Sequence, residues 1–113
     1  TDLAYRDPKT GHTIALISEC SESYDPNLEA LEEEITTALT DSKLEKSNDI
    51  TFSERDGKRS LYSGKMDGIP VLVETLVFKK NSCAYTLTLL GRVKGFQEQQ
   101  KLFQKFVEGF SVE

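Results

Sequence analysis

The strongest pattern of the chain lies at residues 71–90, VLVETLVFKKNSCAYTLTLL. Two runs rich in Val, Leu, Thr, Phe and Tyr flank a polar break at residues 79–82, which is typical of paired strands joined by a short turn. The first run places Leu72, Leu76 and Phe78 on one face and Val71, Val73, Thr75 and Val77 on the other. Both faces of this hairpin are therefore expected to be covered, and helices are the elements that can cover them.

Further strands are predicted on both sides of this hairpin. Residues 3–5 are expected to form a short edge strand, and TIALIS at residues 13–18 alternates apolar side chains on both faces. The part of the chain from residue 44 onward predicts a meander, with strands at residues 44–47 leading into 50–53, then 59–66, 71–79 and 83–90. The pairs Asp56-Gly57 and Asp67-Gly68 predict tight turns within it, because both residue types favour positive φ angles.

Two amphipathic helices complete the pattern. The first begins at Asp25-Pro26, a favourable helix start, and runs to about Leu39 with the stripe Leu28, Leu31, Ile35 and Leu39. The second ends near Gly109 and carries the stripe Phe96, Gln99, Phe103, Phe106, Val107 and Phe110. The predicted fold class is α+β: an antiparallel β-sheet of about six strands sandwiched between an N-terminal-half helix and a C-terminal helix, as a single α/β/α domain over residues 1–113.

Composition and charge narrow the class of function. The chain has 113 residues and a formal net charge of −5, so it is large enough for one core, and its charge argues against binding to a phosphate backbone. No apolar run approaches the length of a transmembrane segment, and no signal-peptide pattern is present. The sequence leaves room for an export signal, a lipid-anchor cysteine or a linker upstream of Thr1.

The first helix carries a cluster of glutamates, Glu29, Glu32, Glu33 and Glu34. Such a cluster could bind a cation. A solvated helix face is favoured, because calcium sites usually recruit loop oxygens and because acidic residues near a helix N-terminus are stabilising by themselves.

Little in the sequence indicates catalysis. His12 is the only histidine, so any catalytic or metal site that needs imidazole would rest on one ring. An enzyme would need a cleft that joins His12 to Asp7 or Glu19. The glycines lie without the context of a phosphate-binding loop. We therefore expect no catalytic residues, no metal site and no cofactor.

The two cysteines are the sharpest chemical feature. Cys20 lies at the end of one predicted strand and Cys83 at the start of another, each on a face with apolar neighbours. If these strands are antiparallel neighbours, the two sulfurs come within bonding distance. A Cys20–Cys83 disulfide, which would imply an oxidising compartment, is favoured over two unrelated buried thiols because the number of cysteines is even and no CxxC pair occurs.

The order of these segments resembles a known fold. A short strand, TIALISEC, the DPNLEALEEEI helix, hairpin-linked strands with MDGIPVLVETLVFKKNSCAYTLTLL and a closing FQKFVEGF helix resemble the PsbP-like fold, which is shared with the Ran-binding Mog protein. Small secreted or lipid-anchored bacterial domains of unknown function are the most similar. This resemblance covers nearly the whole chain and implies a cysteine pair at Cys20 and Cys83 and an extracytoplasmic location, in the periplasm or associated with the outer envelope. It transfers no functional residue.

The leading hypothesis is a non-catalytic domain of the bacterial envelope, an accessory or adaptor that binds another protein through a sheet edge or loop end. The alternative is a carrier of a small apolar ligand or lipid, in a groove between the sheet and the C-terminal helix lined by Phe96, Phe103, Phe106 and Phe110. The same aromatic stripe is more simply explained as the core-facing side of that helix. Fold analogy alone also leaves open a cytosolic regulator of a small GTPase.

Overall fold

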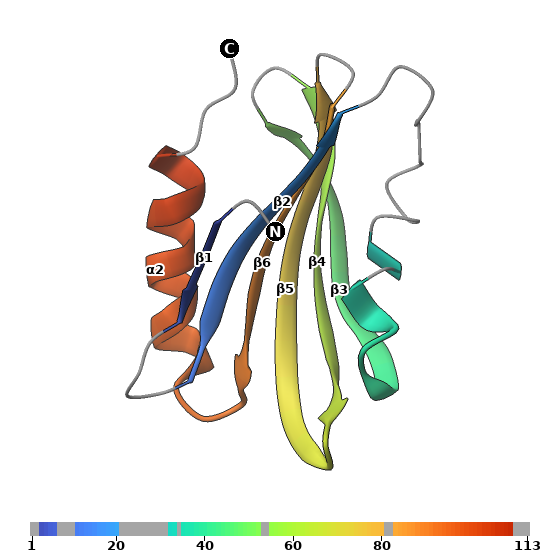
Figure 1. The fold of residues 1–113 in the computed structure, drawn as a ribbon, viewed down its shortest axis with the longest axis vertical. Helices are drawn as coiled ribbons and strands as arrows, with labels where there is room; N and C mark the ends of the chain where they lie inside the picture. Colours follow the sequence, from blue (N-terminus) through green and yellow to red (C-terminus); the bar gives the residue numbers. More distant parts are fainter. Residues whose placement is uncertain are drawn as a thin grey trace.

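A computed structural model of the chain describes residues 3–6, 11–20, 32–33, 35–52, 55–80 and 83–109. Within them lie six strands and one long helix: β1 (Leu3–Arg6), β2 (Thr13–Cys20), β3 (Thr40–Phe52), β4 (Arg55–Met66), β5 (Ile69–Lys80), β6 (Cys83–Arg92) and α2 (Phe96–Gly109). The strands form one sheet in the order β1-β2-β6-β5-β4-β3, and every neighbouring pair is antiparallel. This confirms the predicted α+β class and the six-stranded antiparallel sheet (Figure 1).

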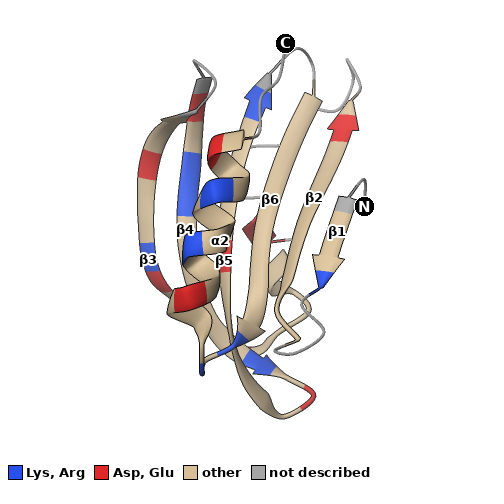
Figure 2. Ribbon diagram, turned by 90° about the vertical axis from the view of Figure 1, so that its left-hand side faces the viewer, with Lys and Arg blue, Asp and Glu red and all other residues tan. Residues whose placement is uncertain are grey.

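Helix α2 covers one face of the sheet, in front of its central strands in Figure 2. The main core forms between them, where the buried aromatic stripe of α2 meets the apolar side chains of β2, β5 and β6. Its fully or nearly buried members are Ile14, Leu76, Phe78, Leu87, Leu89, Phe96, Phe103 and Val107. The predicted C-terminal helix and its core-facing stripe are therefore confirmed for the part that the structure describes.

The opposite face of the sheet is also apolar, as the alternation in β5 predicted. Val71 and Val73 form a second, smaller cluster with Leu39 on this face, and Ile35 packs against it. The fully buried residues of β5 therefore belong to both faces, which is why this strand shows an apolar run and no simple alternation.

The N-terminal-half helix, predicted for residues 25–39, falls largely outside the described residues. At its expected C-terminal end, residues 32–33 and 35–36 are helical. The amide of Thr37 bonds to the carbonyl of Glu33, and β3 begins at Thr40. The helix as a whole, and with it the complete sandwich, stays a prediction.

One predicted turn is wrong. Asp56 and Gly57 lie inside β4, where Gly57 pairs with Ile50 of β3 and with Phe78 of β5. A Cβ atom on Gly57 would lie 2.8 Å from the carbonyl oxygen of Val77, so the glycine serves close strand packing and not a turn. The Asp67-Gly68 turn is confirmed, with φ angles of 52° and 79°.

Strand β3 is also longer than predicted. It is one strand of 13 residues with two register shifts against β4, where the sequence predicted two short segments. Bulges of this kind interrupt the alternation of side chains and so hide a long strand from pattern analysis. Among the described residues, no helix is long and apolar enough to cross a membrane.

Candidate functional site

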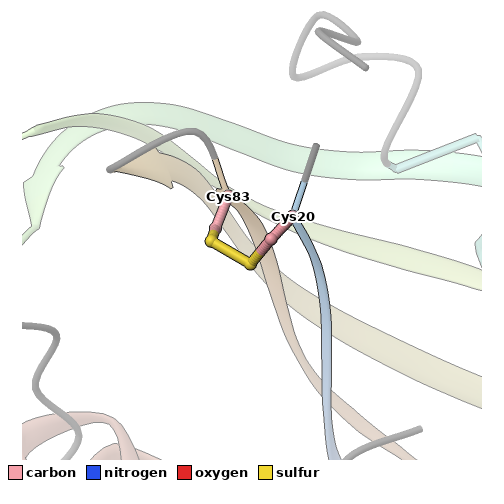
Figure 3. The surroundings of a disulfide bond; sticks show 2 residues. All are labelled: Cys20 and Cys83. Atoms are coloured by element: carbon pink, nitrogen blue, oxygen red, sulfur yellow. A yellow bond between two sulfur atoms is a disulfide. The ribbon is translucent and has the colours of Figure 1, made fainter. Parts of the chain in front are cut away.

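The two cysteines form a disulfide bond, as the sequence favoured. Cys20 is the last residue of β2 and Cys83 the first of β6, and the register of the two antiparallel strands places them directly opposite each other (Figure 3). The bond joins residues 63 positions apart in sequence. It therefore fixes the pairing of two central strands that no short turn connects.

His12 lies at the other end of β2, in a buried position. Its ring is 2% exposed, its Nε2 atom lies 3.1 Å from the carbonyl oxygen of Arg92, and it packs 6.1 Å from the ring of Phe96. Glu19 is seven residues further along the strand, roughly 23 Å away at the usual rise per residue. No cleft can therefore join His12 to Glu19, and Asp7 lies outside the described residues.

The phenylalanine stripe of α2 faces the core. Phe96 and Phe103 are buried, and Phe106 packs against the same cluster. Side chains of the sheet already cover Phe96 and Phe103, so a ligand is not needed to shield them from water. Phe110 lies outside the described residues, and the proposed ligand groove between sheet and helix stays a prediction that these contacts do not favour.

An apolar hollow lies on the opposite face of the sheet. It has a volume of about 380 Å³, within the range of small-molecule sites, and its walls are mainly apolar. Strands β2, β5 and β6 form its floor, and the segment at residues 35–39 forms one side. The lining residues are Ala15, Ile17, Glu19, Ile35, Ala38, Leu39, Met66, Val73, Thr86, Thr88 and Leu90.

A buried polar cluster lies further along this face. The carboxylate of Glu32 is 2% exposed and accepts hydrogen bonds from the hydroxyl groups of Tyr62 and Thr75, at 3.0 Å each. The Nζ atom of Lys58 lies 3.9 Å from the same carboxylate. These partners offset the cost of burying the charge and fasten the helical turn at Glu32 to β4 and β5.

The cluster changes the acidity of Tyr62. Burial raises the pKa of Tyr62 from 10.0 to about 12, and the carboxylate of Glu32 adds to the effect because it repels the tyrosinate charge and accepts a hydrogen bond from the protonated hydroxyl group. Tyr62 is therefore a hydrogen-bond donor at neutral pH and is not poised to transfer a proton. This geometry favours an anchoring role over an acid–base role.

Sequence analysis missed Glu32 and the hollow. Glu32 was expected on a solvated helix face, yet it is buried, whereas its neighbour Glu33 is exposed as expected. The helical spacing carries a signal that distinguishes the two: Glu32 lies four residues after Leu28 and three before Ile35, next to the apolar stripe, whereas Glu33 lies away from it. Among the residues that the structure describes, no group of three or more His, Cys, Asp or Glu side chains could hold a metal ion.

No protein-family model matches the chain, and no curated protein sequence matches it significantly. Solved structures do match. One is a protein of unknown function from Pseudomonas aeruginosa, described as a candidate regulator, with a TM-score of 0.79 and 11% identity over 98% of this chain and 82% of that one. Another is the solution structure of cyanobacterial PsbP (CyanoP) from Synechocystis sp. PCC 6803, with a TM-score of 0.53 and 11% identity over 98% of this chain and 92% of that one. The chain therefore has a PsbP-like fold.

Proposed function

We propose that this protein is a non-catalytic accessory domain of the bacterial cell envelope that binds another protein through an edge of its sheet. The observation that carries the proposal is the outer edge of β2. Strand β1 pairs with β2 only as far as Leu3 opposite Leu16. The last residues of β2, Glu19 and Cys20, are exposed, and no strand of the described residues lies beside them on the outer side, so a strand of a partner protein could add there.

The other edge of the sheet is less suited to a partner strand. Strand β3 is mostly exposed, carries charged side chains along its length and is interrupted by two register shifts. Charges and bulges are features by which edge strands avoid pairing with other chains. The two edges therefore differ, and the β2 edge is the candidate for docking.

The disulfide supports a location outside the cytoplasm. Disulfides persist in oxidising compartments and are rare where thiols are kept reduced. The Cys20–Cys83 bond joins the neighbouring strands β2 and β6, so a reduced protein would lose the covalent link between them. The periplasm or the outer envelope is the compartment that we propose, with a lipid anchor upstream of this chain as one means of attachment.

The separation of the polar groups supports a non-catalytic role. His12 is buried beside Phe96, while Glu19 lies at the opposite end of the same strand. Glu32 is held by two hydroxyl groups and a lysine. A convergent set of acid, base and nucleophile does not arise from these positions.

One observation favours the second candidate, a carrier of a small apolar ligand. It is the hollow of about 380 Å³ on the face opposite α2. The sequence suggested a ligand site between the sheet and α2, whereas this hollow lies on the opposite face, which holds Ala15 and Thr88.

Two measurements test the adaptor proposal. The first counts free thiols by alkylation and mass spectrometry in denatured, unreduced protein from its native host; zero free thiols support the extracytoplasmic location and two oppose it. The second places the photo-crosslinker p-benzoylphenylalanine at Glu19 or, as a matched exposed position on the opposite edge, at Asp49. A crosslinked envelope protein from position 19 and not from position 49 is expected. Products from position 49 alone, or from neither position, would contradict docking at the β2 edge.

A further inference from the structure

The apolar hollow continues into a smaller, basic hollow on the same face of the sheet. The second hollow has a volume of about 200 Å³ and shares Met66 and Leu90 with the first, so the two adjoin. Its other lining residues are Arg6, Gly11, Asp67, Ile69, Val71, Gly91 and Arg92. Together the two adjoining hollows form one trough, mainly apolar along its length and with charged residues at both ends.

The topology brings the two arginines to one end of the trough. Strands β1 and β6 both run antiparallel to β2, so their last residues, Arg6 and Arg92, lie at the same end of the sheet. Figure 2 shows basic residues at the tips of both strands. Both side chains are exposed, and neither forms an ion pair with any residue of the described part of the chain. Among the described residues of this rim, two guanidinium groups outnumber one carboxylate, that of Asp67.

The opposite end of the trough carries the opposite charge. Glu19 lines the apolar hollow near the disulfide, at the far end of β2. Along β6, Arg92 and Thr86 are six residues apart, roughly 20 Å at the usual rise per residue. A ligand with one charged end and a long apolar body would therefore be oriented: an anionic head is attracted by the arginines and repelled by Glu19.

We propose that this trough binds a single-chain anionic amphiphile, a long-chain carboxylate whose head lies between Arg6 and Arg92. Its alkyl chain lies over Leu90, Val73 and Ala15. Paired guanidinium groups suit a carboxylate because they can donate several hydrogen bonds to its two oxygens. The inference rests on the carrier function, the second candidate above, and adds to it the class of ligand and its orientation.

The test uses the intact, oxidised protein and dodecanoate, with 1-dodecanol as a neutral amphiphile of the same chain length. Calorimetric titration gives the affinity, and amide chemical shifts map the site. We expect dodecanoate to bind at least tenfold more tightly than 1-dodecanol and about fourfold more tightly for each methylene added from decanoate upward. Shifts are expected at Ala15, Thr86 and Thr88, and not at Phe103 on the other face.

Variants separate the head from the tail. Because both arginines are exposed, Arg6→Gln and Arg92→Gln are each expected to weaken dodecanoate binding about three- to fivefold, and the double variant about tenfold, with no effect on 1-dodecanol. Lys101→Gln, on the exposed side of α2, is the matched control and should change nothing. Ala15→Leu fills the apolar hollow and should weaken both ligands, while thermal unfolding checks that each variant is folded.

The outcomes distinguish the inference from the carrier function. Equal affinity for dodecanoate and 1-dodecanol, or no effect of the arginine variants, would overturn the inference and leave a carrier without headgroup selection. Binding of neither amphiphile, or shifts confined to the face of α2, would overturn the carrier function as well. Selective binding of dodecanoate that is lost on both Arg6→Gln and Arg92→Gln would support both.

Discussion

Removal of the disulfide is the sharpest test of how this fold is stabilised. The Cys20–Cys83 bond closes a loop with a sequence separation of 63, which contains β3, β4 and β5, and it joins the end of β2 to the start of its neighbour β6. Reduction leaves the ladder hydrogen bonds of the folded state in place. It frees the unfolded chain, which gains conformational entropy.

The size of the effect follows from the loop. For a loop of this length, the chain-entropy model gives a stabilisation of about 4 kcal/mol at 25 °C. Cys20 is exposed, so little buried surface is lost when the sulfurs are replaced by hydroxyl groups. A typical domain is stable by only about 5 to 15 kcal/mol, so the double variant Cys20→Ser with Cys83→Ser is expected to be marginal.

Urea denaturation followed by far-ultraviolet circular dichroism measures this change. With an m-value of about 2 kcal/mol per molar urea, a loss of about 4 kcal/mol lowers the midpoint by about 2 M. The control is the wild-type protein in dithiothreitol, which should unfold at the midpoint of the double variant. A loss below about 1 kcal/mol would refute the entropic reasoning. A double variant much less stable than the reduced wild type would assign the effect to the serines and not to the bond.

Three further predictions concern the buried polar groups. Because the pKa of Tyr62 is raised from 10.0 to about 12 in the folded state, the unfolded chain loses the hydroxyl proton at a lower pH. The free energy of unfolding is therefore expected to fall as the pH rises from about 10 to 12. Urea midpoints measured across this pH range should show the fall in the wild type and a smaller fall in Tyr62→Phe. Glu32→Ala should cost about 2 to 4 kcal/mol because the buried hydroxyl group of Thr75 and the partly buried hydroxyl group of Tyr62 lose their acceptor, whereas the exposed Glu33→Ala should stay within about 0.5 kcal/mol. Equal losses in urea denaturation would contradict the anchoring role. Gly91→Ala should cost about 1 to 3 kcal/mol of stability because its Cβ would overlap the His12 ring, and this cost should be smaller in a chain that also carries His12→Ala. If the losses of stability of the two single variants simply add up in the double variant, the clash is refuted.

Local patterns predicted most of the described fold. The two parities of β5 indicated a sheet buried on both faces, which is confirmed for this strand. The disulfide was expected only if the strands of Cys20 and Cys83 were antiparallel neighbours, and their register confirms that condition. The inference on β5 succeeds because side-chain alternation depends only on the strand itself. The wrong turn at Asp56-Gly57 shows the limit, because a glycine required by a neighbouring strand looks the same in sequence as a glycine required by positive φ.

Glu32 shows a second limit. It was expected on a solvated face with the other glutamates, although its spacing from Leu28 and Ile35 places it beside the apolar stripe. Glu33 lies away from that stripe and is exposed as expected. In the folded chain Glu32 packs against β4 and β5 and accepts hydrogen bonds from Tyr62 and Thr75, which are 30 and 43 positions away in the sequence. Helical periodicity can place Glu32 near the core, but it cannot identify the distant hydroxyl groups that satisfy its carboxylate.

The hollow, by contrast, is indicated in the sequence by the alternation of small and large side chains along the strands. In β6, Leu87 and Leu89 face α2, while Thr86 and Thr88 face the other way, and in β2 Ala15 shares the face of the threonines. Where neighbouring strands pair small residues on one face and large residues on the other, the face with the small residues leaves more volume for other groups to fill, since interiors pack to nearly constant density. Where the alternate side chains of neighbouring strands are small on one face of the sheet and large on the other, the face with the small side chains is therefore the one expected to admit a ligand. Here that is the face opposite α2, where the arginines at the ends of β1 and β6 add the charge that a carboxylate would need.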